Sequence, residues 1–405
     1  MDNPLPSDNR TEKLLCSQVE AIIAETLRYR WLQGMARPRV SVEHFAEEDG
    51  TEAIILHADV FMRIAVKVHL PLGGKQEEEG YRILCDGPEV FKQHLLAPLL
   101  PDVSQLVWLA PYVNADTLHA LTCGMVVTAD DEADIFQLYA DFLRVMKELW
   151  RETRTPAPNR LLQSHYIDRI GERKSLLAEA LNVRSMRDLN RVPIVVNNKM
   201  VGTIGEVLGN FTARVRGTHA KHACLTHGDE HAKNIMVYRD EARGGQDGQI
   251  RWVLIDYTHA NKHGDWVFSI ARMLYWWRLY SVLEMAKKDG GLQDALQVTW
   301  QPSRNGLIIN YDSDALSAAI PPVCRALDRQ VMEYAETVAA EFEEAEQVWR
   351  ERLNLAFFAA VFAASIRHFH RQLPGAEFTV PIMIGESVNA LFGKGALHST
   401  DDNTK

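Results

Sequence analysis

The stretch from Leu225 to Asp240 reads LTHGDEHAKNIMVYRD, and its polar first half changes abruptly into an apolar run. Between His227 and Asn234 it holds two histidines, two acids, a lysine and an asparagine. Such a stretch can be a metal-binding helix, a catalytic loop that runs into a strand, or a polar surface turn without chemistry. The rest of the chain is needed to choose among these three interpretations.

The letters from His227 to His231 match the spacing H-x-x-E-H of a class of zinc enzymes. On a helix the two histidines would share one face, and Glu230 would be the base of a zinc hydrolase. The sequence context is poor, because Gly228 and Asp229 are weak helix formers and NIMVY, which follows, is typical of a strand. The zinc hydrolase stays an alternative.

Asp229 and Asn234 also fit phosphoryl transfer, which needs a carboxylate for a hydroxyl proton and an amide oxygen for Mg²⁺. A second acid, Asp256, ends the apolar run WVLID, where it can ligate the same metal. The two strand-like runs can pair as a hairpin across the glycine-rich residues 243–249, which brings Asn234 and Asp256 together. Taken alone, Asp256 is equally well explained as a strand-end cap.

Lys67 lies in the middle of the apolar run IAVKVH, where an unpaired ammonium group is costly to bury. On an edge strand it would point to solvent, whereas in a nucleotide cleft it would contact phosphates and pair with a glutamate. We prefer Glu89 as this partner, because Pro88 favours a helix start there. The run Glu77–Glu79 is a weaker candidate, and we expect it to be a solvated turn.

The order of the expected elements predicts an α+β, two-lobed molecule with a small antiparallel-sheet N-lobe and a large, mainly helical C-lobe. We expect strands at residues 39–45, 51–58, 62–70, 104–113, 191–196, 234–238 and 251–256. We expect helices at residues 11–33, 131–153, 201–215, 322–354 and 355–372, and another helix within 161–189. The predicted parts are an N-terminal helix in 1–35, a nucleotide-binding lobe in 36–112, a lobe with catalytic loop and acceptor site in 113–395, and a flexible tail in 396–405.

Composition limits the class of partner. Forty-four basic against 54 acidic residues give a net charge of −10, which argues against a protein that binds nucleic acid through phosphate contacts. The five cysteines are scattered without a CxxC pair, as in a cytosolic protein. The first ten residues have no apolar core, and the longest apolar run, Leu353–Ile366, is too short to span a bilayer. We therefore expect a cytoplasmic monomer or homodimer without a membrane partner.

Four segments, in this order, resemble the aminoglycoside phosphotransferase/choline kinase family: Lys67, LVWLAPYVNADTL, THGDEHAKNIMV and VLIDYTHANKHGDWVFSIARML. The resemblance runs from Val40 to Leu274 and is sharpest after Leu225. It implies a bilobal protein-kinase-like fold. It also implies transfer of the γ-phosphate of ATP, or of GTP, to a hydroxyl of an amino sugar, an amino alcohol or a related, often cationic, small metabolite.

The resemblance also implies roles for single residues. Asp229 resembles the catalytic base, His227 the residue that braces the loop, and Asn234 and Asp256 the Mg²⁺ ligands. Lys67 resembles the phosphate-binding lysine and Glu89 its partner glutamate. The hinge that binds adenine through its backbone corresponds to Ala110, Tyr112 and Val113. Gly264 and Asp265 resemble a structural Gly-Asp pair.

The chain departs from the family pattern in the loop. Glu230 stands where the family has an apolar residue, Ala232 and Lys233 where it often has Pro-Gly, and Ser269 where it has an aspartate. These changes leave the acceptor open, so a kinase of a peptide or secondary-metabolite hydroxyl and a nucleotide-binding pseudokinase are alternatives. No acid is assigned to the acceptor, and the neighbouring Trp276 and Trp277 are expected in the core.

Overall fold

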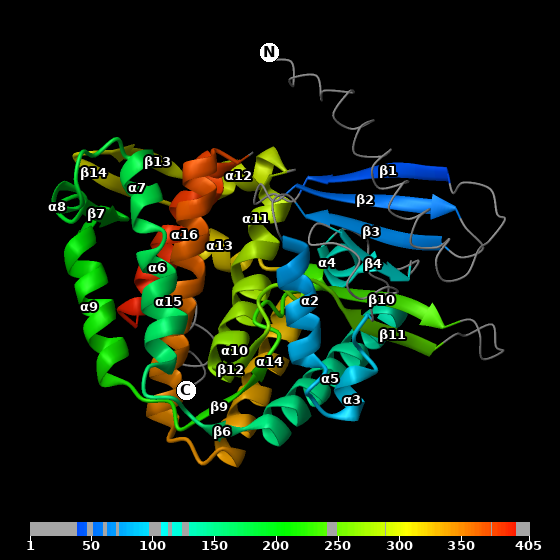
Figure 1. Cartoon of the computed structure of the whole chain (residues 1–405). Helices are drawn as coiled ribbons and strands as arrows, with labels where there is room; N and C mark the ends of the chain where they lie inside the picture. The colour runs from blue at the N-terminus through cyan, green and yellow to red at the C-terminus, as the bar shows by residue number, and fades with distance from the viewer. Residues whose placement is uncertain are drawn as a thin grey trace.

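The computed structural model describes residues 39–46, 52–59, 63–69, 73–96, 107–111, 116–123, 129–240, 249–287, 289–373 and 375–393. Side chains in the strands of residues 39–69 and 107–111 are not described, only their backbone. The expected helix at 11–33, the hinge residues Tyr112 and Val113, and the tail at 396–405 lie outside these ranges. Figure 1 shows the two predicted lobes, with the small sheet (blue) beside a much larger helical part.

The small lobe is an antiparallel sheet of four strands in the order β1-β2-β3-β4, as predicted. Its strands are β1 (Arg39–Ala46), β2 (Glu52–Asp59), β3 (Arg63–His69) and β4 (Val107–Pro111). Lys67 is opposite Ile55 of β2 and Trp108 of β4. The alternative that Lys67 belongs to an edge strand is therefore wrong.

The Glu77–Glu79 run is helical, so the expected solvated turn is wrong. These residues belong to helix α2 (Gly73–Leu84), which packs against β3 and β4 and also against β12 (Asn261–Gly264) of the large lobe. Glu77 is buried together with Leu84, seven residues on and therefore on the same helix face. The buried face of this helix could not be recognised in the sequence, because three consecutive acids are typical of an exposed turn. The short helix expected after Pro88 is present as α3 (Glu89–Lys92).

Helices form most of the large lobe, around a buried apolar core. The longest is α15 (Glu346–Arg371), which packs against α16 (Ala376–Leu391) and α10 (Trp266–Tyr275). The other α-helices are α4 (Leu118–Cys123), α5 (Ala129–Thr153), α6 (Arg169–Gly171), α7 (Lys174–Ala180), α8 (Met186–Leu189), α9 (Ile204–Gly217), α11 (Ser281–Ala286), α12 (Gly290–Leu296), α13 (Ser313–Ala318) and α14 (Pro322–Glu341). None of the helices in the described ranges is long and apolar enough to cross a membrane.

The range 161–189, which was expected to contain a helix, holds the π-helical η1 (Gln163–Asp168), α6, α7 and α8. One predicted boundary is wrong. The break expected at 354 lies at 342–345, where Glu343 takes a left-handed conformation with φ of 52°. Neither Gly nor Pro marks this break, so sequence patterns could not locate it.

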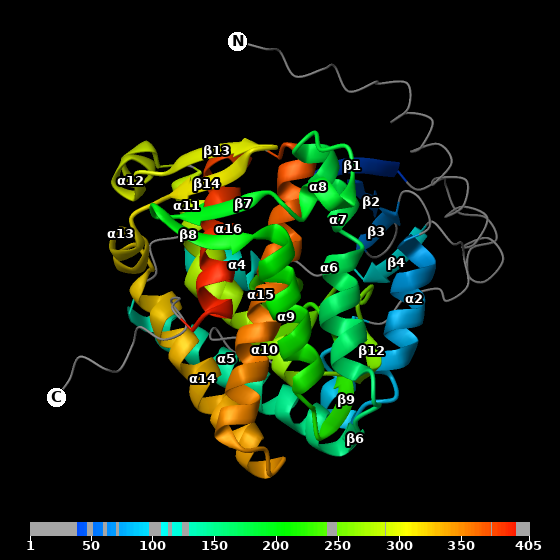
Figure 2. The same ribbon diagram turned by 90° about the vertical axis from the view of Figure 1, so that its left-hand side faces the viewer.

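A four-stranded sheet in the order β13-β14-β7-β8 lies at one end of the helices (Figure 2). It joins two hairpins that are far apart in the chain. Its strands are β7 (Pro193–Val196), β8 (Lys199–Thr203), β13 (Thr299–Ser303) and β14 (Gly306–Asn310). Only β7 was predicted.

Two small sheets contain the ends of the stretch from Leu225 to Asp240. One has the order β12-β9-β6 and contains β9 (His222–Thr226) and β6 (Thr155–Pro156). The other has the order β11-β10-β5 and contains β11 (Gln249–Leu254), β10 (Ile235–Asp240) and β5 (Asp116–Thr117). The predicted pairing of residues 234–238 with 251–256 is confirmed, with Ile235 opposite Leu254.

Candidate active site

The chain between β9 and β10, residues 227–234, is a loop that ends in the 3-10 turn η2 (Ala232–Asn234); we call it loop 227–234. Hydrogen bonds fix it to the end of β11. The backbone N–H of Ile255 donates to Asn234 O at 3.0 Å, and Nε2 of the fully buried His227 donates to Ile255 O at 2.9 Å. Burial lowers the pKa of His227, so its imidazole is neutral near pH 7. The loop and the residue before Asp256 therefore form one unit.

Gly228 turns the chain sharply, with φ of 82°. A Cβ atom here would lie 2.2 Å from His259 O, so both the conformation and the space exclude other residues. Asp229 follows directly. The sequence therefore fixes the start of the loop through its one glycine.

Glu230 organises the backbone of the same turn. It is 1% exposed, and its Oε1 accepts hydrogen bonds from His227 N and Gly228 N, both at 3.1 Å. The same oxygen accepts a third bond, at 2.8 Å, from Oγ of Ser269 on α10. Glu230 and Ser269, which the sequence analysis treated as separate departures from the family pattern, are therefore hydrogen-bonded partners.

Asp229 is buried and its carboxylate is held from two sides. Oδ2 lies 3.3 Å from His231 Nε2 and 3.4 Å from Asn234 Nδ2. Oδ1 forms an ion pair with Arg272 of α10. Sequence reasoning missed Arg272 and predicted no partner for this acid.

Asn234 and Asp256 lie at the adjoining ends of β10 and β11. Asn234 Nδ2 donates to Asp229 O at 3.0 Å, which leaves the amide oxygen as its atom for a ligand. Asp256 has the left-handed φ of 62°, uncommon outside glycine, and its Oδ1 accepts from Thr258 Oγ1 at 2.8 Å. One carboxylate and one amide oxygen are hard ligands, so this pair fits Mg²⁺, which takes few protein ligands and completes its shell with phosphates and water.

Helix α2 reaches the same place from the small lobe. A Cβ atom on Gly80 would lie 1.8 Å from Tyr257 O, so the two backbones touch. Tyr257 N also donates to Oε1 of the buried Glu77 at 3.4 Å. Because Tyr257 follows Asp256, this contact couples the small lobe to the predicted metal ligand.

The predicted nucleotide residues are placed in part. Lys67 is internal to the sheet, and Ala110 lies on β4 opposite Ala65. Glu89 has an 80% exposed side chain and lies 3.6 Å from Lys92. The pairing of Lys67 with Glu89 stays a prediction, and Glu77, which lies between the lobes, is a second candidate.

The zinc interpretation is wrong in its geometry. Residues 227–231 are not helical, and His227 uses Nε2 for the Ile255 carbonyl. Within the described ranges, no group of three or more His, Cys, Asp or Glu side chains could hold a metal ion.

Gly264 and Asp265 have the expected structural role. Asp265 caps α10 by accepting from Val267 N at 3.2 Å, and it pairs with the fully buried Arg352. Trp277 is a core residue as predicted, with Nε1 donating to Tyr139 OH at 2.8 Å.

Trp276 is buried too, but its ring stacks on His231 of the loop, with centroids 4.7 Å apart. The sequence analysis missed this contact. The signal that could have found it is the four-residue spacing of Arg272, Trp276, Tyr280 and Glu284.

No family model matches this sequence, and no curated protein matches it. Among solved structures, the choline kinase LicA from Streptococcus pneumoniae, in complex with AMP, is 12% identical with a TM-score of 0.51, over 93% of this chain and 99% of that one. A Ralstonia eutropha protein, provisionally described as an aminoglycoside phosphotransferase, is 12% identical with a TM-score of 0.49, over 92% of this chain and 97% of that one. Glucosamine kinase in complex with glucosamine, ADP and inorganic phosphate is 14% identical with a TM-score of 0.46, over 94% and 83%.

At these identities the similarity shows the fold alone. LicA, whose TM-score exceeds 0.5, is the structure that supports it. The bilobal protein-kinase-like fold predicted from the sequence is confirmed.

Proposed function

We propose that this chain, which has the protein-kinase-like fold seen in a choline kinase, transfers the γ-phosphate of ATP to a hydroxyl of a small molecule. The observation that carries the proposal is the hydrogen-bonded unit of Asp229, Asn234 and the strand end before Asp256. This unit supplies a carboxylate for a proton and two oxygen ligands for a metal, which are the parts that phosphoryl transfer needs. GTP is the alternative donor.

In this mechanism the chain's residues position groups and stabilise charge. Asp229 orients the acceptor hydroxyl and takes its proton, while His231, Asn234 and Arg272 hold its carboxylate. Neutral His227 keeps the loop on β11. Most of the rate gain comes from this fixed geometry.

The small lobe binds the nucleotide. Lys67 contacts the phosphates and pairs with Glu77 or Glu89, and the backbone from Ala110 through Tyr112 to Val113 binds the base. Asn234 and Asp256 hold Mg²⁺. When bound, the ion neutralises charge on the phosphates.

The ion pair between Arg272 and Asp229 favours a second candidate, a pseudokinase that binds nucleotide without transfer. A carboxylate engaged by a guanidinium group is a weaker proton acceptor than an unpaired one. Turnover separates the two candidates. Nucleotide binding without a phosphorylated product, over a broad acceptor panel, would support the pseudokinase.

The test is ATP-dependent phosphorylation of amino sugars, amino alcohols, hydroxy acids and peptides, followed by mass spectrometry. We expect Asp229→Asn to lower the transfer rate on the order of 10²–10⁴-fold, the size of a general-base effect, and to keep ATP binding. Asp294→Asn, at an exposed position of α12, is the matched control. Full turnover by Asp229→Asn would refute the base, and absence of binding of both ATP and GTP by the wild type would refute the function.

A further inference from the structure

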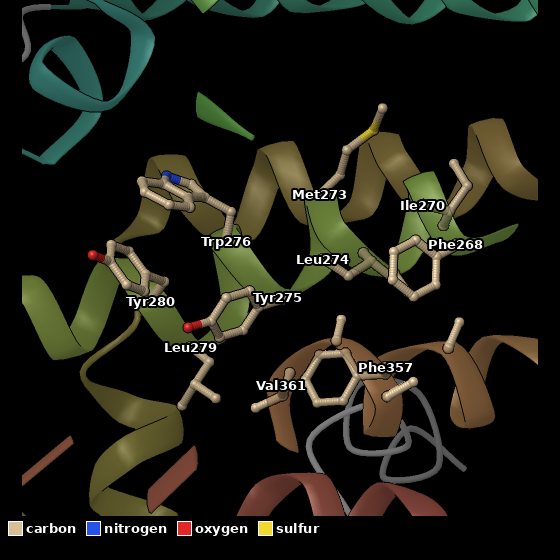
Figure 3. Packing of buried hydrophobic residues seen from close by; sticks show 14 of the residues in the cluster. Phe268, Ile270, Met273, Leu274, Tyr275, Trp276, Leu279, Tyr280, Phe357 and Val361 are labelled. Atoms are coloured by element: carbon tan, nitrogen blue, oxygen red, sulfur yellow. The ribbon is translucent and has the colours of Figure 1, made fainter. Parts of the chain in front are cut away.

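One face of the continuous helix α10–η4–α11 lies along loop 227–234, where η4 spans Trp276–Tyr280. Four side chains spaced by four residues form this face, which we call the stripe: Arg272, Trp276, Tyr280 and Glu284. Because η4 is a π-helical turn, its wider winding keeps positions four apart in line. Figure 3 shows Tyr275 and Leu279 directed toward α15, whereas Trp276 and Tyr280 lie together on another side of the helix.

The middle of the stripe has the chemistry of a cation site. The Trp276 and Tyr280 rings stack with centroids 4.2 Å apart, and Glu284, one turn further on, is buried. Aromatic faces next to a carboxylate attract an ammonium group. His231 stacks on Trp276 and its Nε2 lies 3.3 Å from the Asp229 carboxylate. A cation held at this place is therefore beside the proposed base.

The chain fills this place with its own lysine. Lys233 Nζ lies 5.2 Å from the Tyr280 ring centroid, 5.7 Å from that of Trp276 and 4.0 Å from Glu284 Oε2. The other oxygen, Oε1, lies 2.7 Å from Lys287 Nζ, which is also 5.8 Å from the Tyr280 centroid. Both carboxylate oxygens of Glu284 thus face an ammonium group, and a further cation would meet two like charges.

We propose that Lys233 is a tethered cation that fills the site formed by Trp276, Tyr280 and Glu284, and that the acceptor is a hydroxyl compound with an anionic group. This inference rests on the proposed function and replaces the expectation of a cationic acceptor. A carboxylate, phosphate or sulfate on the acceptor meets the ammonium groups of Lys233 and Lys287.

The charges around the base agree with this substrate class. Two ammonium groups, those of Lys233 and Lys287, contact the one carboxylate of Glu284. These two like charges repel an amine at this place and attract an anionic group.

The first test is a titration with tetramethylammonium chloride at constant ionic strength, read by intrinsic tryptophan fluorescence. We expect no saturable binding to the wild type and a gain in affinity of at least about tenfold in Lys233→Ala, because the rings and Glu284 become available. Lys233→Gly, which also removes the ammonium group, should behave alike. Equal binding by wild type and both variants, or no binding by either variant, would overturn the proposal.

Three controls define the site. Lys233→Arg keeps the charge and should remain like the wild type, and Lys233→Ala combined with Glu284→Gln should lose the gained affinity. Lys221→Ala removes an exposed lysine that pairs with Glu343 at 2.7 Å, and it should change nothing. A gain in Lys221→Ala equal to that in Lys233→Ala would show that the effect is general surface charge.

The second test compares acceptors of equal size, such as glucuronate with glucosamine, in the phosphorylation assay. The wild type should prefer the acid, and Lys233→Ala should shift the preference toward the amine. A wild type that prefers the amine would overturn the anionic assignment. The cation titration needs neither nucleotide nor turnover, so a chain that fails to bind both ATP and GTP would end the proposed function and leave the titration result in place.

Discussion

Loop 227–234 and the stripe that lies along it are built in opposite ways. The loop is held by buried, uncharged donors and by backbone contacts, such as His227 on the Ile255 carbonyl and Gly228 against His259. The stripe contacts the loop through ion pairs and through the faces of aromatic rings. Lys233, the loop residue that contacts Tyr280 and Glu284, has a side chain that is 34% exposed. The loop therefore depends on buried hydrogen bonds to its backbone, and the stripe depends on contacts between charged and aromatic side chains.

This difference assigns two tasks to two regions. A substitution of Gly228 or Glu230 removes support from the backbone that carries Asp229 and Asn234, so it should affect transfer with every acceptor. A substitution of Lys233, whose side chain is 34% exposed, changes the group that faces the buried stripe, so it should change which acceptor binds. We therefore expect large losses of stability for Glu230 variants and a change of acceptor preference for Lys233 variants.

The largest expected effect is at Glu230. Glu230→Leu leaves His227 N and Gly228 N buried without an acceptor, at a cost of about 1–3 kcal/mol each. We expect a clear drop in the urea midpoint together with loss of transfer. The conservative Glu230→Gln keeps an acceptor oxygen and should lose much less.

The same position offers a rescue. Adding Ser269→Asp to Glu230→Leu returns a carboxylate to the space beside the loop backbone, because Ser269 Oγ lies 2.8 Å from the Glu230 carboxylate. The double variant should recover most of the lost stability and transfer. If it is as impaired as Glu230→Leu alone, Glu230 and Ser269 do not share one task, and the loop has another support.

The contact between the lobes should show the next largest effect. Gly80→Ala forces a methyl group into Tyr257 O, and such overpacking costs about 1–3 kcal/mol. We expect weaker ATP binding, because α2 must move away from the residue that follows Asp256. Gly209→Ala, in α9 with no atom within 4 Å of its added Cβ, is the matched control and should stabilise the chain by about 0.5–1 kcal/mol. Equal effects of the two variants would refute the close contact.

The smallest expected effect is a pH dependence at His227. Its pKa is lowered by burial, whereas in the unfolded chain it is about 6.5. Below that pH the unfolded chain binds a proton that the folded chain does not, so stability falls on acidification, by at most about 1.4 kcal/mol per pH unit for one group. Thermal unfolding between pH 7 and 5 should show this slope, and His227→Gln should flatten it. An unchanged slope would mean that His227 titrates normally in the folded chain.

Much of the candidate site was predictable from the sequence because its residues are close in the chain. Asp229, Asn234 and Asp256 lie on a loop and a hairpin, and the apolar runs that flank them show the pairing directly. A similar apolar run predicted a strand around Lys67, but only the pairing of β3 with both β2 and β4 showed that this strand is internal. The two hairpins of the β13-β14-β7-β8 sheet pair across a long separation, and only β7 of that sheet was predicted.

The sequence by itself determined the lobes, the loop with its glycine turn and the hairpin that brings Asn234 to Asp256, since local pattern and turn chemistry specify each of these. Only the tertiary structure decided which acid supports the loop, which glutamate lies between the lobes and which lysine fills the stripe. Glu230, Glu77 and Lys233 look like surface charges in the sequence. Their roles depend on burial and on partners from distant elements, which no local pattern encodes.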